Sequence, residues 1–190
     1  ERTELDIGFS GSFGTRGEDV PEREGLPALG TLLEFGPKLN VQLGRLAGGR
    51  LKLELPVRGV FDASDYLRHR GMAFEPELGL AWGGAGGFTG LSLGAVFADA
   101  RLAHTLYGID AADARADRPA WQGRAGLVAW RAGVSHAIPL GPDWRLFGAL
   151  RGDWVNGAAN VDSPLVVKRS SASAVIGVTW TFGRSEARER

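Results

Sequence analysis

Apolar and polar residues alternate along most of this chain, and a period of two is the pattern of β-strands. Eight segments carry the alternation, and they cover residues 4–13, 33–43, 51–61, 72–82, 91–97, 128–138, 144–154 and 172–182. The sixth segment is the least regular, because Leu127 falls on the wrong side of the pattern. No comparable apolar stripe has a helical period. The sequence therefore predicts an all-β, antiparallel fold.

The charged residues of these segments lie on one side of the alternation only. The apolar side carries no formal charge, whereas the polar side carries seven acids and six bases. A dry protein core cannot hold so many charges without extensive pairing. We therefore expect the polar side to face water or to form a narrow interior of paired charges. It comprises Glu4 and Asp6 together with the candidate lumen charges Glu34, Lys38, Lys52, Glu54, Arg58, Glu75, Glu77, Arg131, Arg145, Arg151 and Asp153.

Alternation alone does not say which side is inside, because a soluble barrel buries its apolar side and a membrane barrel turns it toward lipid. The lengths of the connections favour the membrane barrel. Residues 15–29, 64–71, 109–122 and 158–168 form longer connections, and they alternate with short ones at 47–49, 83–87 and 141–143. Outer-membrane barrels have this asymmetry of short periplasmic turns and long external loops. The sequence therefore predicts an antiparallel transmembrane β-barrel with about eight strands in this chain.

Aromatic residues gather beside the short connections and at the end of the last segment. In a membrane barrel these positions lie at the lipid–water interface, where aromatic side chains form a girdle. The candidate girdle residues are Trp82, Phe88, Trp144, Trp180 and Phe182.

Composition excludes several classes of protein. The formal net charge is +0, so nothing in the charge balance calls for nucleic acid. There is no cysteine, and hence no disulfide framework, thiol nucleophile or thiolate metal site. No run of apolar residues is long enough for a transmembrane helix. The charged first residues do not resemble a secretory signal, which indicates either a mature chain or a missing beginning.

Several short motifs, in this order and spacing, resemble the MipA/OmpV family of Gram-negative outer-membrane proteins. The resemblance runs over essentially the whole chain. It rests on Gly25-Leu26-Pro27, Glu34-Phe35-Gly36-Pro37, Gly49-Arg50-Leu51, Leu55-Pro56-Val57-Arg58, Phe74-Glu75-Pro76-Glu77-Leu78, Tyr107-Gly108-Ile109, Asp162-Ser163-Pro164-Leu165 and Trp180-Thr181-Phe182.

This resemblance implies an outer-membrane barrel of about ten to twelve strands, of which the chain lacks the amino-terminal ones. It also implies a single barrel domain over residues 1–182, with a charged tail at 183–190 that the family does not usually have. The family's namesake is regarded as a scaffold that joins a murein lytic transglycosylase to a murein polymerase. Other members are described as porin-like proteins or adhesins. The alternating last segment, which ends in Phe182, resembles the signal that the outer-membrane assembly machinery reads.

The sequence offers little for catalysis. None of the three histidines (His69, His104 and His136) has a second histidine or a carboxylate at metal-ligand spacing. His136 would need a serine from another strand to act as a rim hydrolase. Glu75 and Glu77 share a strand face at about 7 Å, a spacing that inverting glycoside hydrolases use, but salt bridging within the lumen is the stronger interpretation. We expect no cofactor and no enzymatic activity.

The sequence therefore favours a scaffold or structural protein in the outer membrane, in contact with lipid. A small-solute channel is the main alternative, with a surface adhesin as another. A soluble barrel with an apolar interior is the remaining class, and the terminal Phe182 and the aromatic residues near the short turns speak against it.

Overall fold

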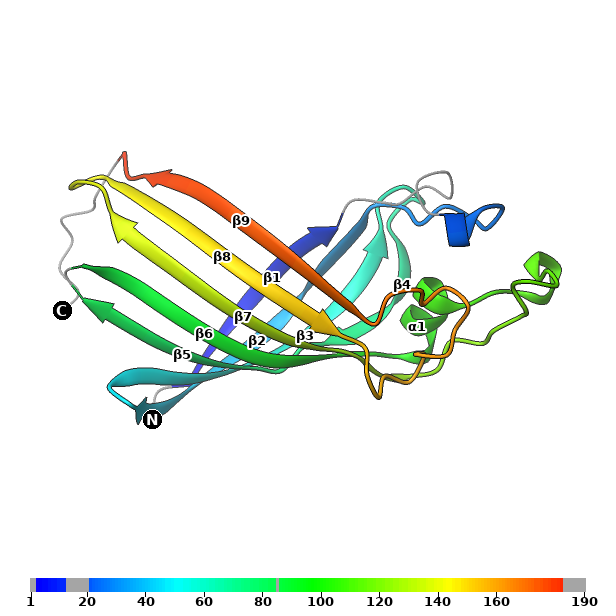
Figure 1. Cartoon of the computed structure of the whole chain (residues 1–190), viewed down its shortest axis with the longest axis horizontal. Coiled ribbons are helices and arrows are strands. Elements are labelled where there is room, and N and C mark those ends of the chain that lie inside the picture. The colour runs from blue at the N-terminus through cyan, green and yellow to red at the C-terminus, as the bar shows by residue number, and fades with distance from the viewer. Residues whose placement is uncertain (1–2, 13–20, 85, 183–190) are drawn as a thin grey trace.

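The computed structural model describes residues 3–12, 21–84 and 86–182, without the side chains of residues 11 and 12. They form one antiparallel sheet with a single α-helix (Figure 1). The strands are β1 (Thr3–Ser12), β2 (Leu32–Leu46), β3 (Gly49–Asp62), β4 (Arg68–Phe74), β5 (Glu77–Gly84), β6 (Gly87–Ala98), β7 (Gly126–Pro139), β8 (Trp144–Trp154) and β9 (Ser170–Trp180). The helix α1 is Ala100–Tyr107, and short 3₁₀ turns lie at Pro21–Arg23 and Ala111–Asp113. The predicted all-β, antiparallel class is confirmed.

The strands pair in the order β1-β2-β3-β4-β6-β7-β8-β9, and β5 lies beside this path and pairs with β3 and β6. Strands β4 and β5 together occupy the place of the predicted fourth segment, which breaks at Glu75 and Pro76. Because proline cannot donate to the ladder, the chain bends there. No pairing among the described residues joins β1 to β9, so these two strands end the sheet. Phe13 and the predicted tail at 183–190 lie outside the described residues.

The two ends of the sheet differ. The tight turns that join β2 to β3, β5 to β6 and β7 to β8 lie at one end, and the long connections and α1 lie at the other (Figure 1). This is the asymmetry that the spacing of the segments predicts.

A β-bulge explains the irregular sixth segment. The register between β6 and β7 shifts between Val96 and Phe97, so that Phe97 stands opposite Leu127 and Val96 opposite Ala129. The extra residue, Val128, packs against the buried cluster beneath α1. The bulge thus resets the alternation at the end of the strand.

The apolar side chains of the strands are exposed, on the face opposite to the charged residues. Ile7 is 86% exposed, Leu93 59% and Ile176 77%. Soluble monomers rarely leave so large an apolar surface in water. The other large side chains exposed on this face include Leu5, Phe9, Met72, Leu78, Leu91, Trp130, Leu150, Trp154 and Val178.

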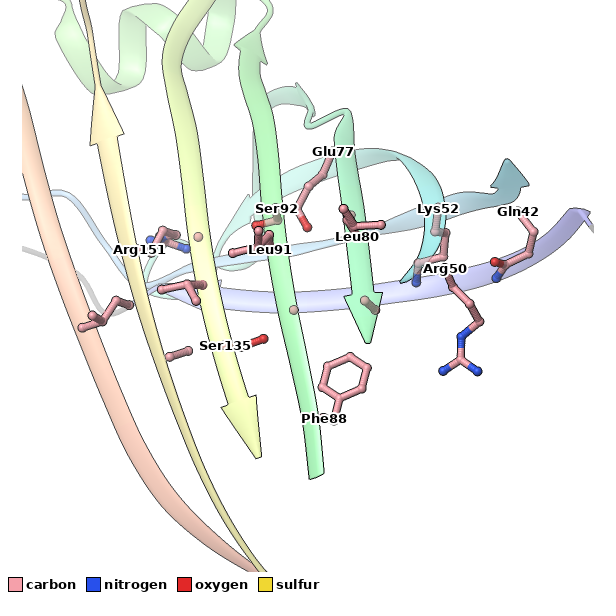
Figure 2. A pocket seen from close by; sticks show the side chains of 17 residues that line it. Gln42, Arg50, Lys52, Glu77, Leu80, Phe88, Leu91, Ser92, Ser135 and Arg151 are labelled. Carbon is pink, nitrogen blue, oxygen red and sulfur yellow. The ribbon is translucent and has the colours of Figure 1, made fainter. Parts of the chain in front are cut away.

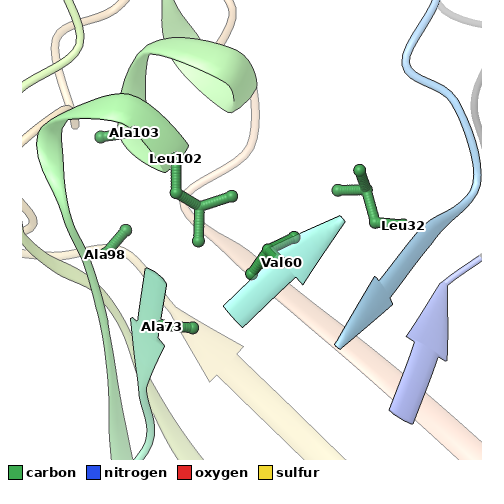
Figure 3. Close-up of a cluster of buried hydrophobic side chains, with 6 residues drawn as sticks. All are labelled: Leu32, Val60, Ala73, Ala98, Leu102 and Ala103. Atoms are coloured by element: carbon green, nitrogen blue, oxygen red, sulfur yellow. The ribbon is translucent and has the colours of Figure 1, made fainter. Parts of the chain in front are cut away.

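The buried core is small and lies under α1 at the long-loop end (Figure 3). Leu102 and Ala103 of the helix pack on Val60 of β3 and on Ala73 and Ala98. The cluster is completed by Leu32. Val60 is fully buried on the same side of β3 as Lys52, Glu54 and Arg58, so α1 covers one end of the charged face.

Asp99 starts this helix, because its carboxylate accepts a hydrogen bond of 2.7 Å from the backbone N–H of Leu102. The helix ends at Tyr107, before Gly108. Burial raises the pKa of the Tyr107 phenol above its ordinary value, because the charged form would lose contact with water.

Replacing Leu102 with alanine is expected to loosen α1 from the sheet. The side chain is 5% exposed, and removing it from a packed cluster costs about 2–3 kcal/mol. Hydrogen exchange at the α1 amides should become faster while exchange in β7 and β8 stays slow. The matched control is Leu140→Ala, at a residue that is 59% exposed in a short turn. Equal exchange at α1 in the two variants would contradict this packing.

Candidate functional site

A chain of ion pairs crosses the charged face of the sheet from β2 to β8. Glu75 is its centre, because its Oε2 lies 3.0 Å from Arg58 Nη1 and 3.4 Å from Arg131 Nη1. Arg58 Nη1 also lies 3.4 Å from Glu34 Oε2, and Arg131 Nε lies 2.9 Å from Asp153 Oδ1. The last ion pair of this series joins Arg151 Nε to Asp153 Oδ2 at 3.3 Å. Acids and bases thus alternate across the sheet, and each charge has an opposite neighbour.

The strand register produces these contacts. Arg131 stands directly opposite Asp153 in the β7–β8 ladder. Arg58 stands opposite Ala73, which places it diagonally from Glu75. Directly opposite and diagonal residues on one face of a sheet are within reach of long side chains.

A glycine lets the chain of ion pairs cross β6. Gly94 of β6 lies between Arg131 and the strand that follows Glu75. It stands opposite Arg131 in the β6–β7 ladder and opposite Glu77 in the β5–β6 ladder. A Cβ atom at residue 94 would lie 2.8 Å from the carbonyl oxygen of Pro76. With no side chain there, Arg131 reaches past β6 to Glu75.

A second group of charges lies nearer the short turns. Lys38 Nζ is 3.5 Å from Glu54 Oε2, and Lys52 binds the other oxygen of the same carboxylate. Asn40 donates a hydrogen bond of 2.6 Å to Asp6. Glu77 and Arg145 take part in none of the ion pairs found among the described residues. The structure therefore brings nine of the eleven predicted lumen charges into ion pairs on one face.

A groove of about 460 Å³ lies on the charged face beside these pairs (Figure 2). The sheet curls around this groove, because its lining comes from β2, β3 and β5 to β8. Small residues form much of the floor, including Gly79, Gly90 and Gly133. Its polar lining is Gln42, Arg50, Lys52, Glu77, Ser92, Ser135 and Arg151.

The aromatic residues proposed for the girdle do not all share one face. Trp144 stacks on Trp180 with ring centroids 5.7 Å apart, and Trp180 contacts Phe182 at 5.9 Å. Trp82 is on the same side and donates a hydrogen bond of 3.0 Å to the carbonyl of Ala47. Phe88 differs, because its ring lies over Gly90 and lines the groove on the charged face. This corrects the expectation for Phe88, which follows its closeness to a turn and overlooks its place in the alternation.

The long loops are held together by buried arginines. Arg118 is 7% exposed and donates hydrogen bonds of 3.0 and 2.8 Å to the carbonyls of Glu22 and Glu24. Arg23 donates one of 3.1 Å to the carbonyl of Leu106. Burial, and then repulsion from Arg118, lowers the pKa of Arg23. These loop charges bind backbone carbonyls of the chain itself.

The histidines do not assemble a metal or catalytic centre in the described part of the chain. The Nδ1 atom of His136 lies 2.9 Å from Thr89 Oγ1. The Nε2 atom of His104 lies 3.2 Å from Asp110 Oδ1. His69 contacts Arg101 at 3.3 Å. The residues described contain no group of three metal-ligating side chains. Glu75, the candidate hydrolase carboxylate, is engaged by two arginines.

Two features of the face were not predicted from the sequence. Arg50 lines the groove but lies one residue before the segment that the alternation marks. Helix α1 falls between the fifth segment and the connection at 109–122, where the alternation marks no element, although Asp99 and the spacing of Leu102, Ala103 and Leu106 are signals that could have found it.

No helix in the described residues is long and apolar enough to span a membrane.

Comparison with known proteins gives one match. The family described as MltA-interacting protein MipA matches residues 1–182. No curated protein and no solved structure matches the chain.

Proposed function

Because the chain belongs to the family of MltA-interacting protein MipA, we propose that it is a non-enzymatic outer-membrane scaffold. In this proposal its strands form a transmembrane barrel domain over residues 1–182. The barrel binds a murein lytic transglycosylase and a murein polymerase, and so links the hydrolysis and the synthesis of murein to the membrane. The assembly machinery would recognise the last strand.

The exposed apolar face supports the membrane location. Leu93, Leu150 and Ile176 lie on strands β6, β8 and β9, and each is more than half exposed. Contact with lipid would remove this surface from water, and the gain in free energy would be about 25 cal/mol for each Å² of apolar surface. Trp82, Trp144, Trp180 and Phe182 lie at the short-turn end, where they would mark the periplasmic interface.

The observation that carries the scaffold proposal is the internal pairing of the charged face. Glu75, the best placed acid, is bound by Arg58 and Arg131. Asp153 is bound by Arg131 and Arg151. A face whose charges bind one another stiffens the sheet and offers no activated nucleophile or proton donor for catalysis. This suits a protein that acts through its contacts.

Site-specific crosslinking in cell envelopes tests the scaffold. Periplasmic enzymes can reach only the short-turn end, so a photoactivatable residue at Gly141 should capture a murein transglycosylase or polymerase. The matched control is Ala120, an exposed residue in the long-loop region. Recovery of these enzymes from Gly141 alone would support the proposal. Their absence at native expression, or capture from residue 120 alone, would contradict it.

A small-solute channel is the second candidate, and the groove of about 460 Å³ on the charged face favours it. Swelling of liposomes in sugar solutions separates the two functions. A scaffold whose charged face is paired and partly covered by α1 should not admit sugars. Fast swelling with the purified chain would favour the channel. A surface adhesin would instead act through the long loops.

A further inference from the structure

The groove on the charged face has the chemistry of a site for a small soluble anion. Arg50 and Lys52 of β3 and Arg151 of β8 line it, against the single acid Glu77. Figure 2 shows Arg151 on one side of the groove and Arg50 and Lys52 on the other. Lys52 pairs with Glu54 and Arg151 with Asp153, so Arg50 is the cation of this lining that no ion pair among the described residues neutralises.

The cations of the groove are also more exposed than the acids that pair with them. Arg151 is 52% exposed at its side chain, and its partner Asp153 is 19%. Lys52 is 37% exposed, and Glu54 is 25%. Arg50 is exposed and takes part in none of the ion pairs among the described residues. The positive groups therefore face the open space while the acids lie behind them.

The other residues that line the groove suit a ligand with a sugar-like ring. Ser92 and Ser135 place their hydroxyl groups over glycines, because a Cβ at Gly133 would lie 2.9 Å from Ser92 Oγ and one at Gly90 would lie 2.7 Å from Ser135 Oγ. Phe88 adds an aromatic face that is 40% exposed. Aromatic faces, hydroxyl groups and cations together recognise a sugar-sized solute with a charged group.

We propose that this groove binds a small soluble solute that carries a carboxylate or phosphate group on a sugar-sized ring. The guanidinium group of Arg50 would hold the oxyanion with paired donors, and Lys52, two residues along the same face of β3, would add a second positive charge. Phe88 would cover the ring. The site goes beyond the scaffold role, and it does not depend on that role.

The test is calorimetric titration of the full chain in an uncharged detergent. The probes are glucose 6-phosphate and glucuronate, with glucose as the uncharged control. Both anions should bind at one site and glucose should not, and binding should weaken with added salt. Arg50→Gln removes one charge-assisted contact and should weaken both anions about tenfold.

A glycine pair supplies the matched variants. A Cβ at Gly79 would meet only the carbonyl oxygen of Lys52 at 3.9 Å, so the backbone there accepts a side chain, and the methyl groups of Gly79→Val should fill the groove and abolish binding. Gly148 lies on the apolar face, where a Cβ would meet the carbonyl oxygen of Val175 at 3.7 Å, and Gly148→Val should bind like the unaltered chain. Circular dichroism checks that both variants fold.

Three results would overturn the proposal. One is equal binding of glucose and the two anions. Another is unchanged binding in both Arg50→Gln and Gly79→Val. The third is displacement of glucose 6-phosphate by phosphatidylglycerol added to the micelles, which would assign the groove to a lipid headgroup.

Discussion

Replacing Glu75 with alanine is expected to lower the free energy of unfolding by about 2 kcal/mol, because it leaves two guanidinium groups without their shared carboxylate. Breaking a fully buried ion pair costs about 3–5 kcal/mol. Glu75, Arg58 and Arg131 are 17–22% exposed at their side chains, so water screens part of this loss. The midpoint of urea unfolding in detergent, followed by circular dichroism, measures the effect.

The matched control is Glu77→Ala. This acid lies on the same face, two residues along the chain, and forms no ion pair among the described residues. It should shift the midpoint far less than Glu75→Ala. Equal shifts in the two variants would mean that the chain of ion pairs does not stabilise the sheet.

Replacing Gly36 with alanine is expected to destabilise the sheet by about 3 kcal/mol, the upper end of the usual cost of overpacking. A Cβ at residue 36 would lie 2.1 Å from the carbonyl oxygen of Val57 and 3.0 Å from the Cα of Arg58. Both contacts are with backbone atoms of β3, which cannot turn aside as a side chain can. Strands β2 and β3 must therefore separate, and Arg58 moves away from Glu75.

Gly79→Ala is the control for this substitution. Its added methyl group meets only the carbonyl oxygen of Lys52, at 3.9 Å. Alanine also restricts the unfolded chain more than glycine does, so this variant should unfold at the same urea concentration or a slightly higher one. If Gly36→Ala unfolds at the midpoint of Gly79→Ala, then the close approach of β2 and β3 is not required.

The two faces of the sheet were predictable because the side-chain period of a strand is two. The alternation alone predicts that Leu93 and Ser92 lie on opposite faces, without knowledge of the partner strands. Specific ion pairs do not follow from it, because they depend on register. Bulges between Gln42 and Gly44 and between Val96 and Phe97 shift that register, and no local signal in the sequence fixes them.

Helix α1 shows a different limit of the sequence. It has eight residues, and so short a helix is not stable alone in water. It forms because Leu102 and Ala103 pack on Val60 and Ala73, which come from strands distant in the chain. The need for that packing cannot be read from residues 100–107. Arg50 was not predicted as a groove residue, because β3 begins at Gly49, before the first apolar residue of the alternating segment.

Accessibility of spin labels on β6 tests most directly that the apolar face meets lipid and the charged face meets water. The chain has no cysteine, so a single introduced cysteine gives a unique attachment site. Labels at Ser92→Cys and Leu93→Cys would stand one residue apart on opposite faces of the strand. In lipid vesicles, oxygen, which concentrates in lipid, should relax the label at residue 93. A water-soluble nickel chelate should relax the label at residue 92. The reverse assignment, or equal access of the nickel chelate to both labels, would contradict the account.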